Sequence, residues 1–149
     1  MRIIVQRSLH SSVTVDSKIV GKIEQGMVIL VGFTHSDTIV DIDYMIHKLL
    51  NLRIFEDDNG QMNKCILDKK GSILSISQFT LYGDTKKGNR PSFIEAMSFN
   101  EAEKLYNIFN KKLSGHIQVE TGIFGSDMKV SITNDGPVTI LLESGNKHD

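Results

Sequence analysis

Two short runs place polar or conformationally special residues where a β-strand would otherwise continue. The first, Ser77-Gln78-Phe79-Thr80-Leu81, ends an apolar segment in three polar side chains around a phenylalanine. Strand ends beside a loop are favoured for ligand contacts, because the scaffold is stiff and backbone amides become available. The alternative is an ordinary amphipathic strand end, on which Gln78 and Thr80 share one face and Ser77 and Phe79 the other.

The second run is Asn134-Asp135-Gly136-Pro137-Val138-Thr139, set between β-branched flanks that alternate apolar and polar residues. The flanks predict two strands, and a tight turn between them needs only Asn-Asp or Asp-Gly. The turn does not require Pro137. Proline cannot donate to a β-ladder and is confined to edges, strand starts, bulges or turns, so its presence here needs another reason. The other interpretation is an edge turn with no further role.

Other chemistry-bearing residues do not form a recognisable site. Cys65 lies in no local motif, which favours a buried structural thiol over a nucleophile paired with a histidine. Asp41 and Asp43 are two residues apart on a predicted helix, which indicates solvated charges. The histidines lack metal-ligand spacing, so we expect no metal site and no cofactor; they are His10, His35, His47, His116 and His148.

The bulk properties describe one globular domain over residues 1–149. With 17 basic and 18 acidic residues, the formal charge of −1 argues against binding nucleic acid by bulk charge, although a local basic patch remains open. No signal peptide or membrane span is evident, and a lone cysteine excludes an intramolecular disulfide framework, so we expect a cytoplasmic protein. Residues 145–149 are expected to be a frayed tail.

The predicted elements are those of an α+β domain with a mixed or largely antiparallel sheet system, since two helices are too few for alternating βαβ units. Asp37 is the expected cap of the first helix, and Ser98 with Glu101 forms a capping box for the second, expected from about Phe99 to Leu113. A hairpin turn is expected at 16–18. The expected strands are 3–5, 12–15, 19–23, 27–33, 52–55, 72–81, 117–119, 129–133 and 138–142.

Several blocks, in order along nearly the whole chain, resemble the D-aminoacyl-tRNA deacylase family (D-tyrosyl-tRNA deacylases). They are Met1–Arg7, Ser77–Leu81, Gly88–Phe93, Gly122–Gly125 before Met128, and Asn134–Thr139. The Ser77–Leu81 and Asn134–Thr139 blocks at this separation make the resemblance specific. Ser126 is a departure, because the family pattern leads us to expect alanine there, and it puts a detail of the pocket in doubt.

The resemblance implies a homodimer of single domains, each a barrel-like roll of mixed or antiparallel sheets with two main helices. It implies that the Gly136-Pro137 peptide bond is cis and that its carbonyls accept hydrogen bonds from the substrate ammonium group. This motif would reach across the dimer interface into the partner's pocket and reject L-aminoacyl-tRNA. Arg7 and Asn134 would support it; for Arg7, the alternative is a solvated strand charge.

The implied reaction is hydrolysis of the ester that joins a D-amino acid, or glycine mischarged on tRNA(Ala), to tRNA, as chiral proofreading in translation quality control. The backbone amides of Phe79 and Thr80 would hold the oxyanion and Gln78 would position the reactants, with the tRNA 2′-hydroxyl taking part. The Thr80 hydroxyl is an alternative nucleophile that lacks an adjacent base. Ser77 and Met128 would complete the substrate pocket.

A loop with three basic residues, Lys86, Lys87 and Arg90, is the expected contact for tRNA phosphates, although such residues are more often simply solvated. Two alternatives remain open at this point. One is a non-catalytic RNA-binding dimer that uses this loop, and the other is an ordinary hydrolase that uses Cys65.

Overall fold

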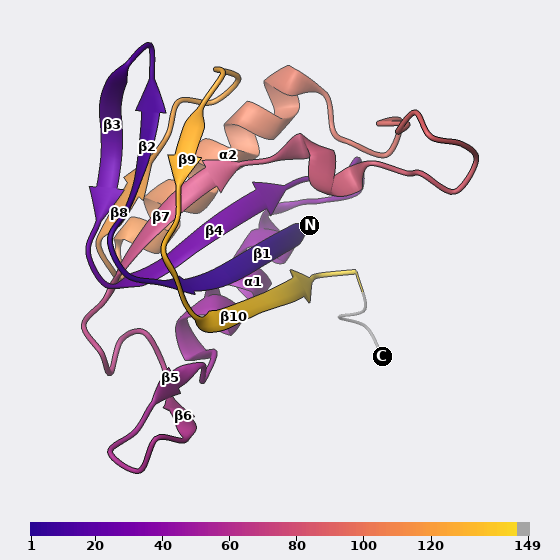
Figure 1. Cartoon of the computed structure of the whole chain (residues 1–149). Helices are drawn as coiled ribbons and strands as arrows, with labels where there is room; N and C mark the ends of the chain where they lie inside the picture. The colour runs from indigo at the N-terminus through magenta and orange to yellow at the C-terminus, as the bar shows by residue number, and fades with distance from the viewer. Residues whose placement is uncertain (146–149) are drawn as a thin grey trace.

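The computed structural model describes residues 1–145 as a five-stranded sheet with helices on one face and a smaller sheet on the other (Figure 1). The elements, in chain order, are β1 (Arg2–Ser8), β2 (Ser11–Val15), β3 (Lys18–Ile23), β4 (Gly26–Gly32), α1 (Ile39–Asn51), β5 (Phe55–Glu56), β6 (Met62–Lys64), β7 (Ser72–Ser77), the 3-10 helix η1 (Phe79–Tyr82), α2 (Phe99–Ser114), β8 (Val119–Thr121), β9 (Lys129–Ser131) and β10 (Asn134–Glu143).

The main sheet has the strand order β10-β1-β4-β7-β8 and mixed pairing. β1 is antiparallel to both β10 and β4, whereas the β4–β7 and β7–β8 pairs are parallel. A second sheet, β3-β2-β9, packs its apolar side against β4 and β7, and β5 and β6 form a small ribbon. The α+β class with two helices and mixed sheets is confirmed, and the sheets do not close into a barrel.

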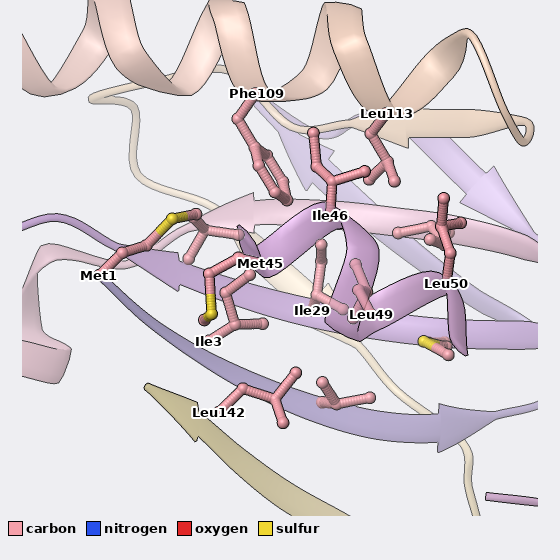
Figure 2. Packing of buried hydrophobic residues seen from close by; sticks show 14 of the residues in the cluster. Met1, Ile3, Ile29, Met45, Ile46, Leu49, Leu50, Phe109, Leu113 and Leu142 are labelled. Atoms are coloured by element: carbon pink, nitrogen blue, oxygen red, sulfur yellow. The ribbon is translucent and has the colours of Figure 1, made fainter. Parts of the chain in front are cut away.

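The principal core lies between the main sheet and the two helices. On α2 the buried side chains recur at helical spacing, at Ala102, Tyr106, Phe109 and Leu113. Figure 2 shows Phe109 and Leu113 pointing from α2 toward Ile46 of α1. Because this core fixes the sheet on one side, the ends of β4 and β7 are stiff positions from which to build a site.

Both predicted helices form, but their N-termini differ from the expectation. Thr38, not Asp37, caps α1, and Asp41 completes its capping box. Asp37 is instead buried, where it accepts hydrogen bonds from the Met1 amine at 2.6 Å and from the Thr34 amide at 2.8 Å. Asp41 is buried as well, so its interpretation as a solvated charge was wrong. Ser98 is the N-cap of α2, but its hydroxyl donates to Glu101 and makes no capping bond to the backbone.

Among the strands, the hairpin of β2 and β3 is confirmed, and both turn residues, Asp16 and Ser17, have positive φ. The strand predicted over 52–55 is reduced to a short segment that begins at Phe55, because α1 continues to Asn51. β9 and β10 are not a hairpin, since β9 pairs with β2 and β10 with β1. The tail predicted over 145–149 lies outside the described residues except for Gly145.

Candidate functional site

A cavity of about 490 Å³ opens at the end of the main sheet, where β4 and β7 give way to loops. Most of its lining is apolar or aromatic, and its polar side chains are few, which is the usual composition of a small-molecule site. The lining comes from the ends of β4 and β7, the start of α2 and the loop before β9. The residues are Val31, Gly32, Phe33, Ile76, Ser77, Gln78, Phe79, Met97, Phe99, Ala102, Phe124, Gly125, Ser126, Asp127, Met128 and Val130.

The chain changes conformation inside the run that the sequence singles out. β7 ends at Ser77, the Gln78 amide donates to the Val31 carbonyl at 2.7 Å, and η1 begins at Phe79. The predicted strand over 72–81 is therefore too long, and Gln78 and Thr80 do not lie on one face of a strand. As in any helix, the first amides of η1, those of Phe79 and Thr80, have no acceptor within the helix. The Gln78 side-chain amide donates to the Thr80 hydroxyl.

Two aromatic pairs flank the cavity. Phe79 is 57% exposed and packs edge-on against Phe93 at 5.1 Å between ring centroids. Phe99 packs edge-on against Phe124 at 5.0 Å, and Phe124 also contacts Tyr106. Aromatic side chains that are only partly covered offer flat surfaces on which a second ring can stack.

Two glycines in the segment before β9 allow the cavity wall to close tightly. A Cβ at Gly125, which has φ of +77°, would lie 2.5 Å from the Phe99 ring, and a Cβ at Gly122 would lie 2.4 Å from the Met128 sulfur. Phe99 would have to move if Gly125 were replaced, and Met128 would have to move if Gly122 were replaced. Ser126, next in the chain, is half-buried and lines the cavity.

The second run forms a wide bulge in edge strand β10. Gln6 pairs with Thr139 and Ser8 with Asn134, so Arg7 alone faces the residues 135–138. The Gly136-Pro137 peptide bond is cis, as predicted, and both residues are exposed. We call residues 134–138 the selector bulge, after the role that the family resemblance implies for Gly136 and Pro137. An edge strand and a bulge are both places where proline interrupts no ladder.

The Asn134 side chain closes the selector bulge. Its Oδ1 accepts from the Val138 amide at 2.7 Å, and its Nδ2 donates to the Val138 carbonyl at 3.2 Å and to the Thr139 hydroxyl at 3.0 Å. These bonds replace ladder bonds that the bulged residues cannot make with β1. The bulge is therefore held by a side chain from its own first residue.

Arg7 ties the selector bulge to the body of the protein. Its Nε donates to the Asp135 carbonyl and its Nη1 to the Ile54 carbonyl, both at 2.8 Å. The side chain is 8% exposed, so Arg7 is not a solvated strand charge. A buried guanidinium needs such acceptors, because an unpaired charge in the interior is costly.

The selector bulge and the cavity lie at opposite corners of the same sheet. β10 and β7 are three strands apart, or about 14 Å at the usual strand spacing. Arg7, which faces the bulge, is in register with Met27 and Ile73, and Ile73 is about 13 Å along β7 from Ser77. The two corners are thus about 19 Å apart in one chain, and Figure 1 shows β10 on the far side of β1 and β4 from β7.

The remaining predicted residues lie outside the cavity. Lys86, Lys87 and Arg90 are all exposed on the loop between η1 and α2. Cys65 is only partly buried, which corrects the expectation of a buried thiol, and it does not line the cavity.

Within residues 1–145, no group of three His, Cys, Asp or Glu side chains is placed to hold a metal ion. Neither helix in that range is long and apolar enough to cross a membrane.

Sequence reasoning did not select the part of the lining that comes from α2 and the loop before it, namely Met97, Phe99 and Ala102. Ala102 lies on the buried face of α2. Phe99 carries a usable signal, because it is a large apolar residue at the start of α2 and is 58% exposed there. An aromatic residue left off the buried face of a helix is a reasonable candidate for ligand contact.

Comparison with known proteins gives a consistent result. The sequence profile of the family described as D-Tyr-tRNA(Tyr) deacylase matches residues 4–143. The chain is 56% identical over 145 residues to a D-aminoacyl-tRNA deacylase of Bacillus cytotoxicus, with 97% of this chain and 99% of the relative covered. A D-aminoacyl-tRNA deacylase of Bacillus mycoides is 54% identical with the same coverage.

Two solved structures are also similar. One, described as c-Myc DNA unwinding element binding protein, has a TM-score of 0.92 and 42% identity, and covers 96% of this chain and 98% of its own. The other, described as a probable eukaryotic D-amino acid tRNA deacylase, has a TM-score of 0.82 and covers 95% of this chain and 97% of its own. At 19% identity, this second likeness bears on the fold alone.

Proposed function

The chain belongs to the D-Tyr-tRNA(Tyr) deacylase family, and from this premise we propose that it hydrolyses the ester between a D-amino acid and the terminal ribose of tRNA. Water adds to the ester carbonyl, the bond to the ribose oxygen breaks, and that oxygen leaves with a proton. The products are free D-amino acid and tRNA. The observation that carries the proposal is the apolar cavity with Ser77, Gln78 and Phe79 in its wall.

The cavity suits the last nucleoside of tRNA. Single-stranded nucleic acid is commonly bound by stacking bases on aromatic side chains. Phe99 and Phe124 provide aromatic surface inside the cavity, Met128 provides a flexible apolar one, and Phe79 stands at the start of η1. A base seated among these residues would bring its ribose ester toward Ser77 and η1.

Catalysis rests on backbone groups and on the substrate. The amides of Phe79 and Thr80 hold the oxyanion that forms when water attacks, and Gln78 positions the reactants. Removing one such donor typically costs about 100- to 1,000-fold in rate. The Thr80 hydroxyl is poorly suited as a nucleophile, because its side-chain neighbour is an amide donor and not a base that could take its proton. The tRNA 2′-hydroxyl remains available to assist.

Chirality is read by the selector bulge of a second copy of the chain. In one chain the bulge is about 19 Å from the cavity by the strand spacings above, so it cannot reach a substrate bound there. The Gly136 and Pro137 carbonyls of a partner would accept hydrogen bonds from the substrate ammonium group and leave no room for an L side chain. Glycine, which has no side chain to exclude, would also be released, including from tRNA(Ala).

Subunit mixing tests this division. Gly136→Val disables the selector, because a Cβ at Gly136 would lie 2.8 Å from Val138 and 3.1 Å from Arg7. Ser126→Trp fills the cavity. We expect each variant alone to be inactive and a mixture of the two to recover about a quarter of wild-type activity, since half of the dimers would be mixed and each would hold one intact site. No recovery in mixtures shown to contain mixed dimers would contradict a selector supplied in trans.

The direct test of the reaction compares D-tyrosyl-, L-tyrosyl- and glycyl-tRNA as substrates for the purified chain in the cytoplasmic pH range. We expect the chain to release D-tyrosine and glycine. Hydrolysis of L-tyrosyl-tRNA should be slower by orders of magnitude. Release of both enantiomers would indicate a general esterase. An alkylated Cys65 should leave the activity unchanged.

Nucleic-acid binding without hydrolysis is a second candidate. It is favoured by the exposed basic loop with Lys86, Lys87 and Arg90, and by the description of a 42% identical structure as a DNA-element binding protein. Tight binding of tRNA or DNA with no release of D-amino acid would select this candidate over the hydrolase.

A further inference from the structure

A groove of about 560 Å³ lies beside the cavity, and the reaction proposed above makes no use of it. Its walls come from the start of β1, the end of β10, the end of η1 and the loop that leads into α1. Figure 1 shows the start of β1 and the end of β10 at the same end of the main sheet. We call this space the side groove and define it by Arg2, Thr34, Val40, Tyr82 and Glu143.

The side groove and the cavity are neighbours along this end of the sheet. Arg2, in the groove, is in register with Gly32, which lines the cavity, so one strand spacing of about 5 Å separates the two residues. η1 contributes to both spaces, since Phe79 at its start lines the cavity and Tyr82 at its end lines the groove. At the usual 3-10 rise these ends are about 6 Å apart, which a single phosphodiester linkage can bridge.

The side groove contains a fixed planar surface. The Arg2 guanidinium lies over the Tyr82 ring, 4.6 Å from its centroid. Two contacts hold it there, because its Nη1 donates to the Leu81 carbonyl at 2.9 Å and its Nε is 3.0 Å from the Glu143 carboxylate. Val40, which is 60% exposed, adds apolar surface. RNA bases stack on aromatic rings and on guanidinium planes, so the groove offers the kind of surface that a base requires.

The charges of the side groove suit an uncharged base better than a phosphate group. Its lining holds two cations against three carboxylates, a net charge of −1; the cations are the Met1 amine and Arg2, and the carboxylates are Asp37, Asp41 and Glu143. Binding to phosphate needs unpaired cations. A base edge instead carries donors and acceptors side by side, and the Arg2–Glu143 pair presents both kinds of group.

We propose that the side groove binds the nucleoside that precedes the esterified one at the 3′ end of tRNA, which is a cytidine in every tRNA. The proposal rests on the proposed function, because that function seats the terminal nucleoside in the cavity. The base of the preceding nucleoside stacks against Tyr82 and Arg2, and its edge faces Glu143. Two bases held on either side of η1 fix the ribose ester between them more firmly than one base alone.

The test measures the dissociation constants of two ligands by titration calorimetry, alongside hydrolysis of D-tyrosyl-tRNA. The ligands are adenosine 5′-monophosphate and the dinucleotide cytidylyl-adenosine, which both carry a phosphate and differ by the added cytidine. We expect the wild type to bind the dinucleotide about 5- to 150-fold more tightly, as for the stacking of one further base. In Tyr82→Ala this ratio should fall toward one. Tyr44→Ala is the matched control, because Tyr44 is a 38% exposed tyrosine of α1 outside the side groove, and it should keep the wild-type ratio.

Two further variants keep the test valid if Tyr82→Ala disturbs folding. Tyr82→Phe retains the ring and should keep the ratio, whereas Tyr82→Leu retains apolar volume without the ring and should lower it. Equal binding of the two ligands by a wild type that hydrolyses D-tyrosyl-tRNA would overturn the side groove and leave the proposed function intact. A wild-type ratio in Tyr82→Leu would overturn it as well, because the second base would then bind elsewhere. A preference for the dinucleotide that depends on Tyr82, without release of D-tyrosine, would uphold the groove and overturn the proposed activity.

Discussion

The cavity and the selector bulge are built in opposite ways. The cavity is enclosed by strand ends and the start of α2, and its walls belong to or touch the hydrophobic core. The bulge stands on an edge strand, its Gly136 and Pro137 are exposed, and it is held by hydrogen bonds from Asn134 and Arg7. The cavity walls are fixed by packing and enclose a space that a ligand can fill. The selector bulge is fixed by hydrogen bonds at the edge of the sheet, and its exposed backbone is accessible to another molecule. The difference supports the proposal above that the site is divided between two chains.

The largest effect is expected from filling the cavity. Ser126→Trp should lower kcat/KM for D-tyrosyl-tRNA by about 100-fold or more, because the substrate can no longer be positioned. Ser131→Trp is the control, since Ser131 is exposed on β9 and outside the cavity. Steady-state kinetics on both variants measure the effect. Full activity in Ser126→Trp would place the reaction elsewhere.

The next largest effect is expected from opening the selector bulge. Asn134→Ala removes three hydrogen bonds that hold the selector bulge. It should lower the rate of D-tyrosyl-tRNA hydrolysis by about 10- to 100-fold, because the Gly136 and Pro137 carbonyls would be misplaced although they remain in the chain. The thermal midpoint should change little at an edge strand. Asn63→Ala, which removes an exposed turn bond to Asp57, is the control. An unchanged rate would mean that the bulge is held without Asn134.

A change below the cavity should affect stability and not hydrolysis. The Tyr106 hydroxyl donates to the Ser75 carbonyl at 2.8 Å within the core. Tyr106→Phe removes this hydrogen bond, while the Gly122 amide still donates to the same carbonyl at 3.4 Å. The variant should therefore lower the free energy of unfolding by about 0.5–1.5 kcal/mol, with kcat/KM retained. Urea denaturation and kinetics at pH 7 measure the two quantities. A selective loss of rate would give Tyr106 a part in the reaction.

The same residue gives a pH dependence. Burial raises the pKa of the Tyr106 phenol, so the folded chain keeps this proton when the unfolded chain loses it. The stabilisation is present below about pH 10, the usual tyrosine value, and falls as the pH rises above it. We expect the wild type to lose stability between pH 9 and pH 11 more steeply than Tyr106→Phe. Burial also raises the pKa of Tyr82, so the variant should still lose some stability.

The smallest effect is expected in the basic loop, which belongs to neither region. Lys86→Ala, Lys87→Ala and Arg90→Ala should each weaken tRNA binding and flatten its salt dependence, by a log–log slope of about 0.7–0.9 for each lost phosphate contact. Binding titrations from low to moderate salt measure the slope, and Lys22→Ala on β3 is an exposed control. Unchanged slopes in all three variants would show that the loop is simply solvated.

Much of the fold and the identity of the chemically important runs were predictable from the sequence. Hydrophobic spacing located α1, α2, β4 and the β2–β3 hairpin, because these elements are specified by their own residues. The family resemblance carried by Ser77–Leu81 and Asn134–Thr139 agrees with the comparisons. It also led to the expectation of a cis Gly136-Pro137 bond, which the structure contains.

The predictions that were wrong concern features that depend on contacts with residues far away in the sequence. The sequence predicts a strand through Leu81, but η1 begins at Phe79, whose ring packs on Phe93 from a later loop. Asp37, the predicted cap, accepts a hydrogen bond from the Met1 amine, and Thr38 caps α1 in its place. Neither contact leaves a periodic signal in the local sequence.

The separation of the two runs was decided only by the tertiary structure. The sequence places residues 77 and 136 in one chain, and nothing in either run tells whether they meet. The strand order β10-β1-β4-β7 and the register of β1 put them at opposite corners of the sheet. Strand order depends on long-range pairing, because residues that are far apart in the chain become neighbours only when the whole sheet has formed.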